Sequence, residues 1–87
     1  MNKSLSGDIA ANVVKAVQAY YFAETPPPKF VTVDQKTLRQ YRNDPNSFCA
    51  KVTIESEHVP GKVKKHTVHI RFRLDHKKHI QGSVQHL

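Results

Sequence analysis

The chain has 87 residues, with 14 lysines and arginines, 7 aspartates and glutamates and 6 histidines, so its formal net charge is +7 at pH 7. This length holds one small domain, which we place at residues 1–87, and it lies near the size at which monomers become marginally stable. The single cysteine, Cys49, excludes an internal disulfide framework and a cysteine-rich zinc site.

The first predicted element is an amphipathic helix that ends at about Ala23. Ser6 and Asp8 are both suitable N-caps for it. The apolar residues that follow recur at helical spacing: Ile9, Val13, Val17 and Tyr20. Phe22 lies outside this apolar arc. It either folds back on the prolines that follow or contacts a partner, and a homodimer through this helix is an alternative that the sequence leaves open.

A short strand and a second helix are predicted next. The three prolines that follow the first helix end it, because proline lacks a backbone donor. The residues just before Asp34 favour a strand, and Asp34 can cap a short helix over residues 35–42. Leu38 and Tyr41 would share the inner side of that helix. The basic residues on its opposite side are candidates for extending a binding surface: Lys36, Arg39 and Arg42.

The clearest pattern is an amphipathic β-hairpin made of residues 48–57 and 65–75. On both strands the apolar residues occupy even positions, so one face of the hairpin is apolar. Directly paired residues share a face, so the even positions of the two strands must pair with each other and the loop between them must hold an odd number of residues. A strict two-residue turn at residues 60–61 is therefore excluded unless a bulge intervenes. A loop centred on Gly61 gives these apolar pairs: Ile54 with Val68, Val52 with Ile70, Ala50 with Phe72, and Phe48 with Leu74.

The C-terminal stretch permits two interpretations. Ile80 and Val84 keep the even parity of a third strand, whereas Gly82 and the polar ending equally suit a tail that frays from about residue 80. In both cases the first helix covers the apolar face of the hairpin. The sequence therefore predicts an α+β fold: an N-terminal amphipathic helix packed on a small antiparallel sheet, with a short second helix.

Basic residues gather in the C-terminal part of the chain. Residues 58–87 hold seven lysines and arginines, one acidic residue and all six histidines. In the predicted register Lys51 and Arg71 lie directly opposite each other on the face away from the helix. Their repulsion is easier to understand if an anion lies between them, and phosphates of nucleic acid are the obvious candidate. We therefore predict a nucleic-acid-binding surface made of Lys51, Lys62, Lys64, Lys65, His69, Arg71, Arg73, Lys77 and Lys78.

Histidine is the other unusual feature of the composition. His66 and His69 differ in parity, so they point to opposite faces of their strand and cannot chelate one metal ion together. Without a second cysteine or a carboxylate cluster, we predict no metal and no cofactor. Full protonation of the six histidines would raise the formal charge from +7 to +13. We therefore predict tighter binding of polyanions at mildly acidic pH.

The predicted function is non-catalytic binding of DNA or RNA. The outward positions of the hairpin carry no aromatic residue, which favours contact with phosphates over stacking on bases. One alternative is a small interaction or inhibitor module whose basic face docks on an acidic protein. Another is a small ribonuclease, because general acid/base cleavage of RNA uses residue types that are present here: Tyr41, His69, Arg71 and Arg73.

Two features bear on location. No apolar run approaches the roughly 18 residues that a membrane-spanning helix needs, and residues 1–8 lack the apolar core of a signal peptide. A single cysteine fits a reducing compartment. We therefore expect a cytoplasmic protein with no membrane partner.

Overall fold

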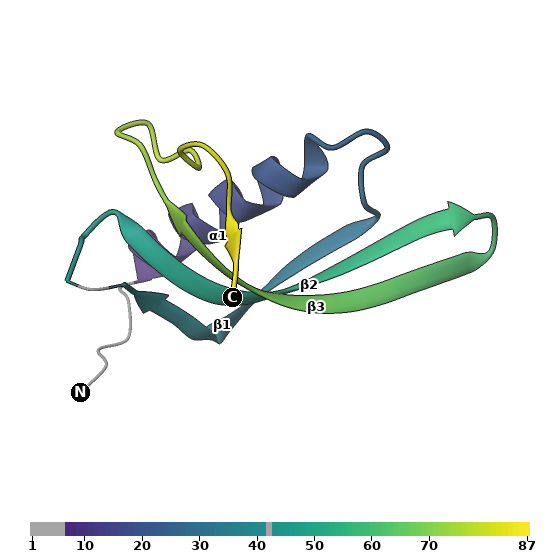
Figure 1. Cartoon of the computed structure of the whole chain (residues 1–87), viewed down its shortest axis with the longest axis horizontal. Helices are drawn as coiled ribbons and strands as arrows, with labels where there is room; N and C mark the ends of the chain where they lie inside the picture. Colours follow the sequence, from purple (N-terminus) through teal and green to yellow (C-terminus); the bar gives the residue numbers. More distant parts are fainter. Residues whose placement is uncertain (1–6, 42) are drawn as a thin grey trace.

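The computed structural model of the chain describes residues 7–41 and 43–87. It has one helix and four strands in this order: α1 (Gly7–Phe22), β1 (Phe30–Gln40), β2 (Ser47–Val59), β3 (Lys62–Arg73) and β4 (Gln85–His86). The strands form one antiparallel sheet in the order β1-β2-β3-β4, and α1 lies across one of its faces (Figure 1). The predicted α+β arrangement is confirmed. Ser6 and Arg42 lie outside the described residues.

The buried side of α1 is the one that its apolar spacing predicts. Val13 and Val17 are completely buried, and Tyr21 lies on the same side. The Gln18 side chain donates a hydrogen bond from Nε2 to the main-chain carbonyl of Val31 at 3.1 Å. This bond ties the middle of the helix to β1, the edge strand of the sheet. Phe22, in the last turn, is 42% exposed.

The predicted second helix over residues 35–42 is wrong, because residues 35–40 continue β1. Asp34 does organise a local turn, as its side chain accepts the Lys36 N–H at 3.1 Å and its main-chain carbonyl accepts the Thr37 hydroxyl at 2.8 Å. The turn makes a bulge in the strand instead of starting a helix. After the bulge, Leu38 joins the core and is only 2% exposed. Pairing with β2 and burial of Leu38 outweigh the local preference for helix.

The hairpin register differs by two residues from the predicted one. The residues of its inner face pair as Phe48 with Phe72, Ala50 with Ile70, Val52 with Val68, and Ile54 with His66. The even positions still lie on one face, toward α1, as the parity argument requires. Residues 60–61 make a two-residue turn between Val59 and Lys62. This turn is possible because β2 contains one extra residue, a bulge, between Ser56 and Val59. Gly61 has a left-handed φ of 82°, which suits a tight turn of this kind.

The C-terminal stretch forms a short strand beside β3. Ile80 bridges to Leu74, and β4 then pairs with the middle of β3. Ile80 and Val84 are partly buried and pack against the core. The chain end is also held, because the Leu87 N–H donates to the His69 carbonyl at 2.9 Å.

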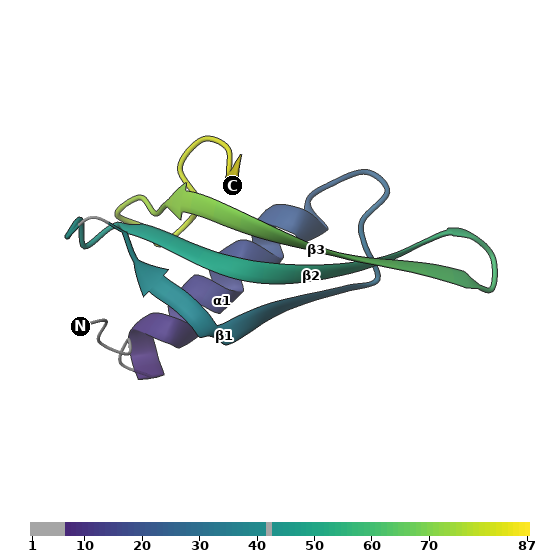
Figure 2. The same ribbon diagram turned by 60° about the horizontal axis from the view of Figure 1, so that its bottom comes forward.

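The β2–β3 hairpin is longer than the sheet that surrounds it. The pairing of β1 with β2 reaches only to Phe30 and Glu55. Residues 56–64, which we name the arm, pair only with one another in the described part of the chain. Figure 2 shows the arm extending past the ends of α1 and β1. Val59 and Val63 within it are 54% and 48% exposed, so the arm has no core of its own.

Candidate nucleic-acid interface

The face of the sheet opposite α1, which we name the free face, is covered by no other helix or strand of the described residues (Figure 2). Its side chains form rows across the strands, because directly paired residues share a face. From the end farthest from the arm, the rows are Ser47 and Arg73; Arg39, Cys49, Arg71 and Gln85; Asp34, Lys51 and His69; Thr32, Thr53 and Thr67; and Phe30, Glu55 and Lys65. Lys51, Lys65, His69 and Arg71 thus occupy the face on which the parity argument places them.

The predicted opposition of Lys51 and Arg71 is wrong, because the register is two residues away from the expected one. Lys51 instead lies opposite Asp34 on β1. Arg71 lies opposite Cys49, and Arg39 flanks the same cysteine from β1. The two arginines therefore share a row with the thiol between them, so like charges are not directly paired.

Arg71 is half-buried and held by two neighbours. Its Cζ lies 4.6 Å from the centroid of the Tyr41 ring, and Nη1 donates to the Tyr41 hydroxyl at 2.7 Å. Nη2 donates to the Gln85 side-chain carbonyl on β4. These contacts fix the guanidinium on the free face and leave part of its five N–H donors for other acceptors. Tyr41 thus supports Arg71 from the loop that joins β1 to β2.

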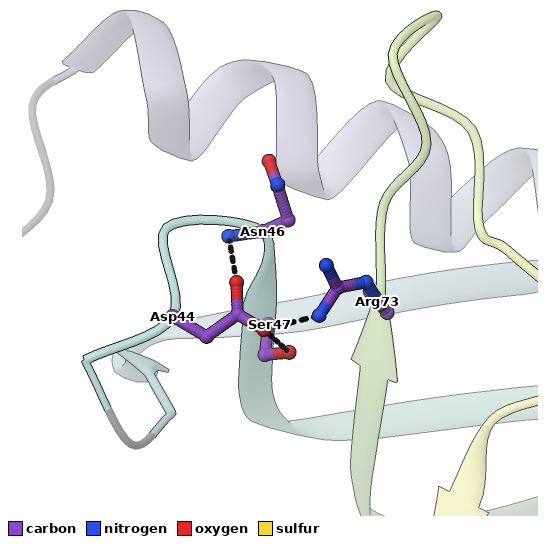
Figure 3. Close-up of polar contacts among 4 residues, drawn as sticks. All are labelled: Asp44, Asn46, Ser47 and Arg73. Carbon is purple, nitrogen blue, oxygen red and sulfur yellow. Dashed lines mark hydrogen bonds and ion pairs between the residues drawn. The ribbon is translucent and has the colours of Figure 1, made fainter.

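Arg73 is paired with an acidic residue of the same loop (Figure 3). Asp44 accepts the Arg73 guanidinium, the Ser47 hydroxyl at 3.0 Å and the Asn46 N–H at 2.9 Å. The Asn46 N–H, followed by Ser47 and Arg73, lowers the pKa of Asp44 below its ordinary value. The ion pair links the β1–β2 loop to the end of β3. Arg73 therefore has a structural role, and its charge is partly compensated by Asp44.

The free face carries two hollows. One, of about 250 Å³, is mainly polar and is lined by Tyr41, Ser47, Arg71, Phe72, Arg73, Gln81, Ser83 and Gln85. The other, of about 330 Å³, is lined by Lys36, Thr37, Arg39, Cys49, Ala50, His69 and Leu87. Both include residues of the row that contains the two arginines. Lys36 and Arg39, expected to extend the surface from a helix, instead reach the free face from the bulged strand.

The lysines near the arm are exposed and form no ion pair with the described residues. Lys62 and Lys64 belong to the arm, and Lys65 lies at its base, opposite Glu55. Their ammonium groups make no hydrogen bond or ion pair with any residue in the described ranges. The other carboxylate of this region, Glu57, is paired with Lys29 at 3.3 Å. Positive charge is therefore available to a partner at this end of the molecule.

Lys77 and Lys78 lie far from the arm. They belong to a turn at residues 75–79 in which the Asp75 side chain accepts the Lys77 N–H at 2.8 Å and the His79 N–H at 3.0 Å. Figure 1 shows this turn and the arm at opposite ends of the long axis of the molecule. The nine predicted residues therefore fall into three groups, on the arm and its base, on the free face, and on this distant turn.

The histidines divide between the two faces of the sheet. His69 lies on the free face, next to Lys51, whereas His66 pairs with Ile54 and lies on the helix side. The expectation that these two side chains point to opposite faces is confirmed. Within residues 7–41 and 43–87, no group of three or more His, Cys, Asp or Glu side chains is placed to hold a metal ion.

Sequence reasoning missed one aromatic residue of the free face. Phe30 is 55% exposed and lies in the row of Glu55 and Lys65. The signal was present, because Val31 and Val33 are the apolar residues that turn inward and Phe30 must then point outward. The face on which Phe30 lies can be predicted only when the inward-facing residues of β1 have been identified first.

Comparison of the chain with models of known protein families, with curated proteins and with solved structures found no match. Among the described residues, no helix combines the length and the apolar character needed to cross a membrane.

Proposed function

We propose that the protein is a non-catalytic nucleic-acid-binding domain that contacts phosphates through the arm and the adjoining free face. The observation that carries this proposal is the pair of exposed lysines at 62 and 64 on a two-stranded ribbon that extends beyond the core, with Lys65 at its base. Each phosphate neutralised by a lysine releases counterions, so such a group gives affinity without contacts to bases.

The shape of the arm supports a duplex or structured nucleic acid as the ligand. A two-stranded β-ribbon is narrow enough to enter the major groove of a DNA duplex, and several DNA-binding proteins use strands in this way. Lys51 and His69 continue the positive surface from the arm along the free face. Phe30 lies beside the base of the arm and is exposed, so in this proposal it would contact a sugar or base at the edge of such a ligand.

The arginines have a secondary role in this proposal. Arg73 is engaged by Asp44, and Arg71 is engaged by Tyr41 and Gln85. Arg71 offers its remaining donors to a phosphate at the polar hollow, whereas Arg73 mainly holds the loop that shapes the hollow. The proposal places the protein in the cytoplasm, where nucleic acid is accessible and where Cys49 stays reduced.

The test is fluorescence anisotropy with the nuclease-treated protein and labelled duplex DNA, duplex RNA and single strands, in salt from about 50 to 200 mM. Two variants carry the same change of charge at opposite ends of the molecule: K62E with K64E in the arm, and K77E with K78E in the distant turn. We expect the arm variant to bind at least tenfold more weakly and to lose about two units of the salt slope. The turn variant should lose less than threefold.

Equal losses in both variants would mean that only the overall charge matters, and the arm would not be the site. Absence of binding at the lowest salt would reject the nucleic-acid proposal and favour an acidic protein partner. The RNA probe should remain intact after the titration; cleavage that is lost in H69Q would support the ribonuclease alternative. Affinity should be higher at pH 6 than at pH 8, and equal affinities would remove histidine from the interface.

A further inference from the structure

One edge of the sheet is open along more than half of β3. β4 pairs only with Ile70 and Arg71, and the Leu87 N–H adds one bond to the His69 carbonyl. Within the described ranges, no strand lies on this side of residues 62–68. Figure 1 shows β4 beside the middle of β3, from where β3 runs on into the arm. The open stretch is long enough to pair with a strand of ordinary length.

The main-chain groups that face the open edge can be identified from the bond to Leu87. In an antiparallel strand the N–H and C=O of one residue point to the same side, and the side alternates along the chain. The carbonyl of His69 accepts from Leu87, so the polar groups of His69 point to this edge. By alternation those of Val63, Lys65 and Thr67 do the same. The edge thus presents a row of N–H donors and carbonyl acceptors beside which no described strand lies.

The side chains along this edge are exposed and basic. Residues 62–67 are all exposed, and β3 contains no acidic residue. Lys62 and Lys64 belong to one face of the ribbon and Lys65 to the other, because side chains alternate along a strand. A strand added beside β3 would therefore meet lysine on both of its faces. Opposite charges on directly paired residues stabilise a sheet and like charges destabilise it, so an acidic strand is favoured at this edge.

Other occupants fit the edge less well. A second copy of the chain would bring the same three lysines against the first set, and like charges would then face each other across the new pair of strands. A nucleic-acid phosphate accepts hydrogen bonds from lysines and N–H groups, but it has no donor for the carbonyls of the edge. An extended polypeptide supplies both donors and acceptors at the spacing of a strand.

We propose that residues 62–68 of β3 bind an extended acidic segment of a partner protein, which adds to the sheet as a strand antiparallel to β3 and in line with β4. Main-chain hydrogen bonds to Val63, Lys65 and Thr67 give the affinity, and carboxylates opposite the lysines select the partner. The site does not depend on the proposed function. Competition of this strand with nucleic acid for the lysines of the arm is a consequence that does rest on it.

The experiment is an NMR titration of the ¹⁵N-labelled full chain with the synthetic peptide acetyl-VTTEEVE-amide, without nucleic acid. In the antiparallel arrangement the first residue of the peptide lies opposite Val68 and the last opposite Lys62, so each glutamate faces a lysine. We expect saturable binding that shifts the amides of Val63, Lys65 and Thr67. These amides should gain at least fivefold more protection from hydrogen exchange than those of the residues between them, which face β2.

Matched peptides separate main-chain pairing from ionic attraction. N-methylation of the fourth and sixth residues of the peptide removes donors that face β3 and should weaken binding at least tenfold. N-methylation of the third and fifth residues, whose N–H groups point away from β3, should weaken it less than threefold. A peptide with lysine in place of each glutamate should not bind. Equal effects of the two methylated peptides, or equal affinities of the acidic and basic peptides, would overturn the proposal.

One substitution in the chain tests the edge without changing its charge. V63P removes an N–H that faces the edge, and proline is tolerated in an edge strand where its missing donor faces solvent. V63P should bind the acidic peptide at least fivefold more weakly, whereas V63T, which keeps the N–H, should bind it as the parent chain does. Full peptide affinity in V63P, or shifts confined to the free face around Lys51 and Arg71, would contradict a site at the edge.

The peptide site and the proposed function can fail separately. V63P keeps every lysine, so its affinity for duplex nucleic acid should stay within threefold of the parent chain. A parent chain that binds duplex nucleic acid but not the acidic peptide would reject the edge site alone. A parent chain that binds the peptide with the expected pattern of protection, but no nucleic acid, would support the edge site and reject the proposed function.

Discussion

The β2–β3 hairpin has two regions with the same backbone pairing and different environments. In the region beside α1 and β1, alternate side chains are fully buried, and Val52 and Ile70 have no exposed surface. In the arm, Val59 and Val63 are about half exposed, and their exposed neighbours are the charged or polar residues Glu57, His58, Lys62 and Lys64. A two-stranded ribbon without a covering layer contributes little to stability. The comparison indicates that the covered region holds the fold, and it leaves the arm accessible for the contact with nucleic acid that we propose.

The largest expected effect comes from placing one carboxylate in each region. Ile70→Asp buries an unpaired charge in the core and should cost several kcal/mol, which is comparable to the whole stability of a small domain. Val63→Asp places the same group on the exposed arm and should change the free energy of unfolding by less than about 0.5 kcal/mol. Thermal unfolding followed by circular dichroism measures both. A folded Ile70→Asp protein would contradict the assignment of the two regions.

Removing the arm should separate binding from folding. Glu55 and Lys65 are a direct pair, so residues 56–64 can be replaced by an Asn-Gly turn that suits a two-residue hairpin loop. The shortened chain should keep its cooperative unfolding transition, with a melting temperature within a few degrees of the parent chain. Its affinity for duplex nucleic acid should fall at least tenfold. Unchanged affinity would mean that the interface lies on the free face alone. Loss of folding would show that the arm stabilises the core.

The smallest expected effect concerns acid and the loop that Asp44 holds. The pKa of Asp44 is lowered in the folded protein, so its contribution to stability is present above the ordinary value of 3.8 and is lost as the pH falls through the folded value. Hydrogen exchange below pH 4 should show the amides of Asn46 and Ser47 losing protection before those of the core strands. Asp44→Asn should show the weaker protection already at neutral pH. Simultaneous loss of protection in the loop and the core would contradict a local role for Asp44.

The sequence predicts the parts of the fold that depend on a repeated pattern. The spacing of Val13 and Val17 places the helix, and the even parity of residues 48–54 and 68–74 places the apolar face of the hairpin. The predicted register is wrong by two residues. The parity argument requires only that the numbers of two paired residues add up to an even value, and the bulge before Val59 determines which even value occurs. The second helix is wrong because Asp34 and Leu38 suit a helix start and a bulged strand equally well.

The surroundings of the candidate site were beyond the reach of sequence reasoning. Which residues of β3 point outward follows from alternation, so His69 and Arg71 could be placed on the free face. The partners of the arginines could not, because Tyr41 and Asp44 are about thirty residues away in the chain from Arg71 and Arg73.

The hydrogen bond from Gln18 to Val31 also affects how copies of the chain meet. An exposed edge strand is a template on which a strand of another molecule can pair, and this leads to aggregation. Gln18 occupies one carbonyl of β1 with a short-range bond that salt does not screen. The opposite edge, along the arm part of β3, is protected by repulsion among Lys62, Lys64 and Lys65, which salt does screen. Concentrated salt, which screens this repulsion, should therefore favour self-association at the arm before any at β1.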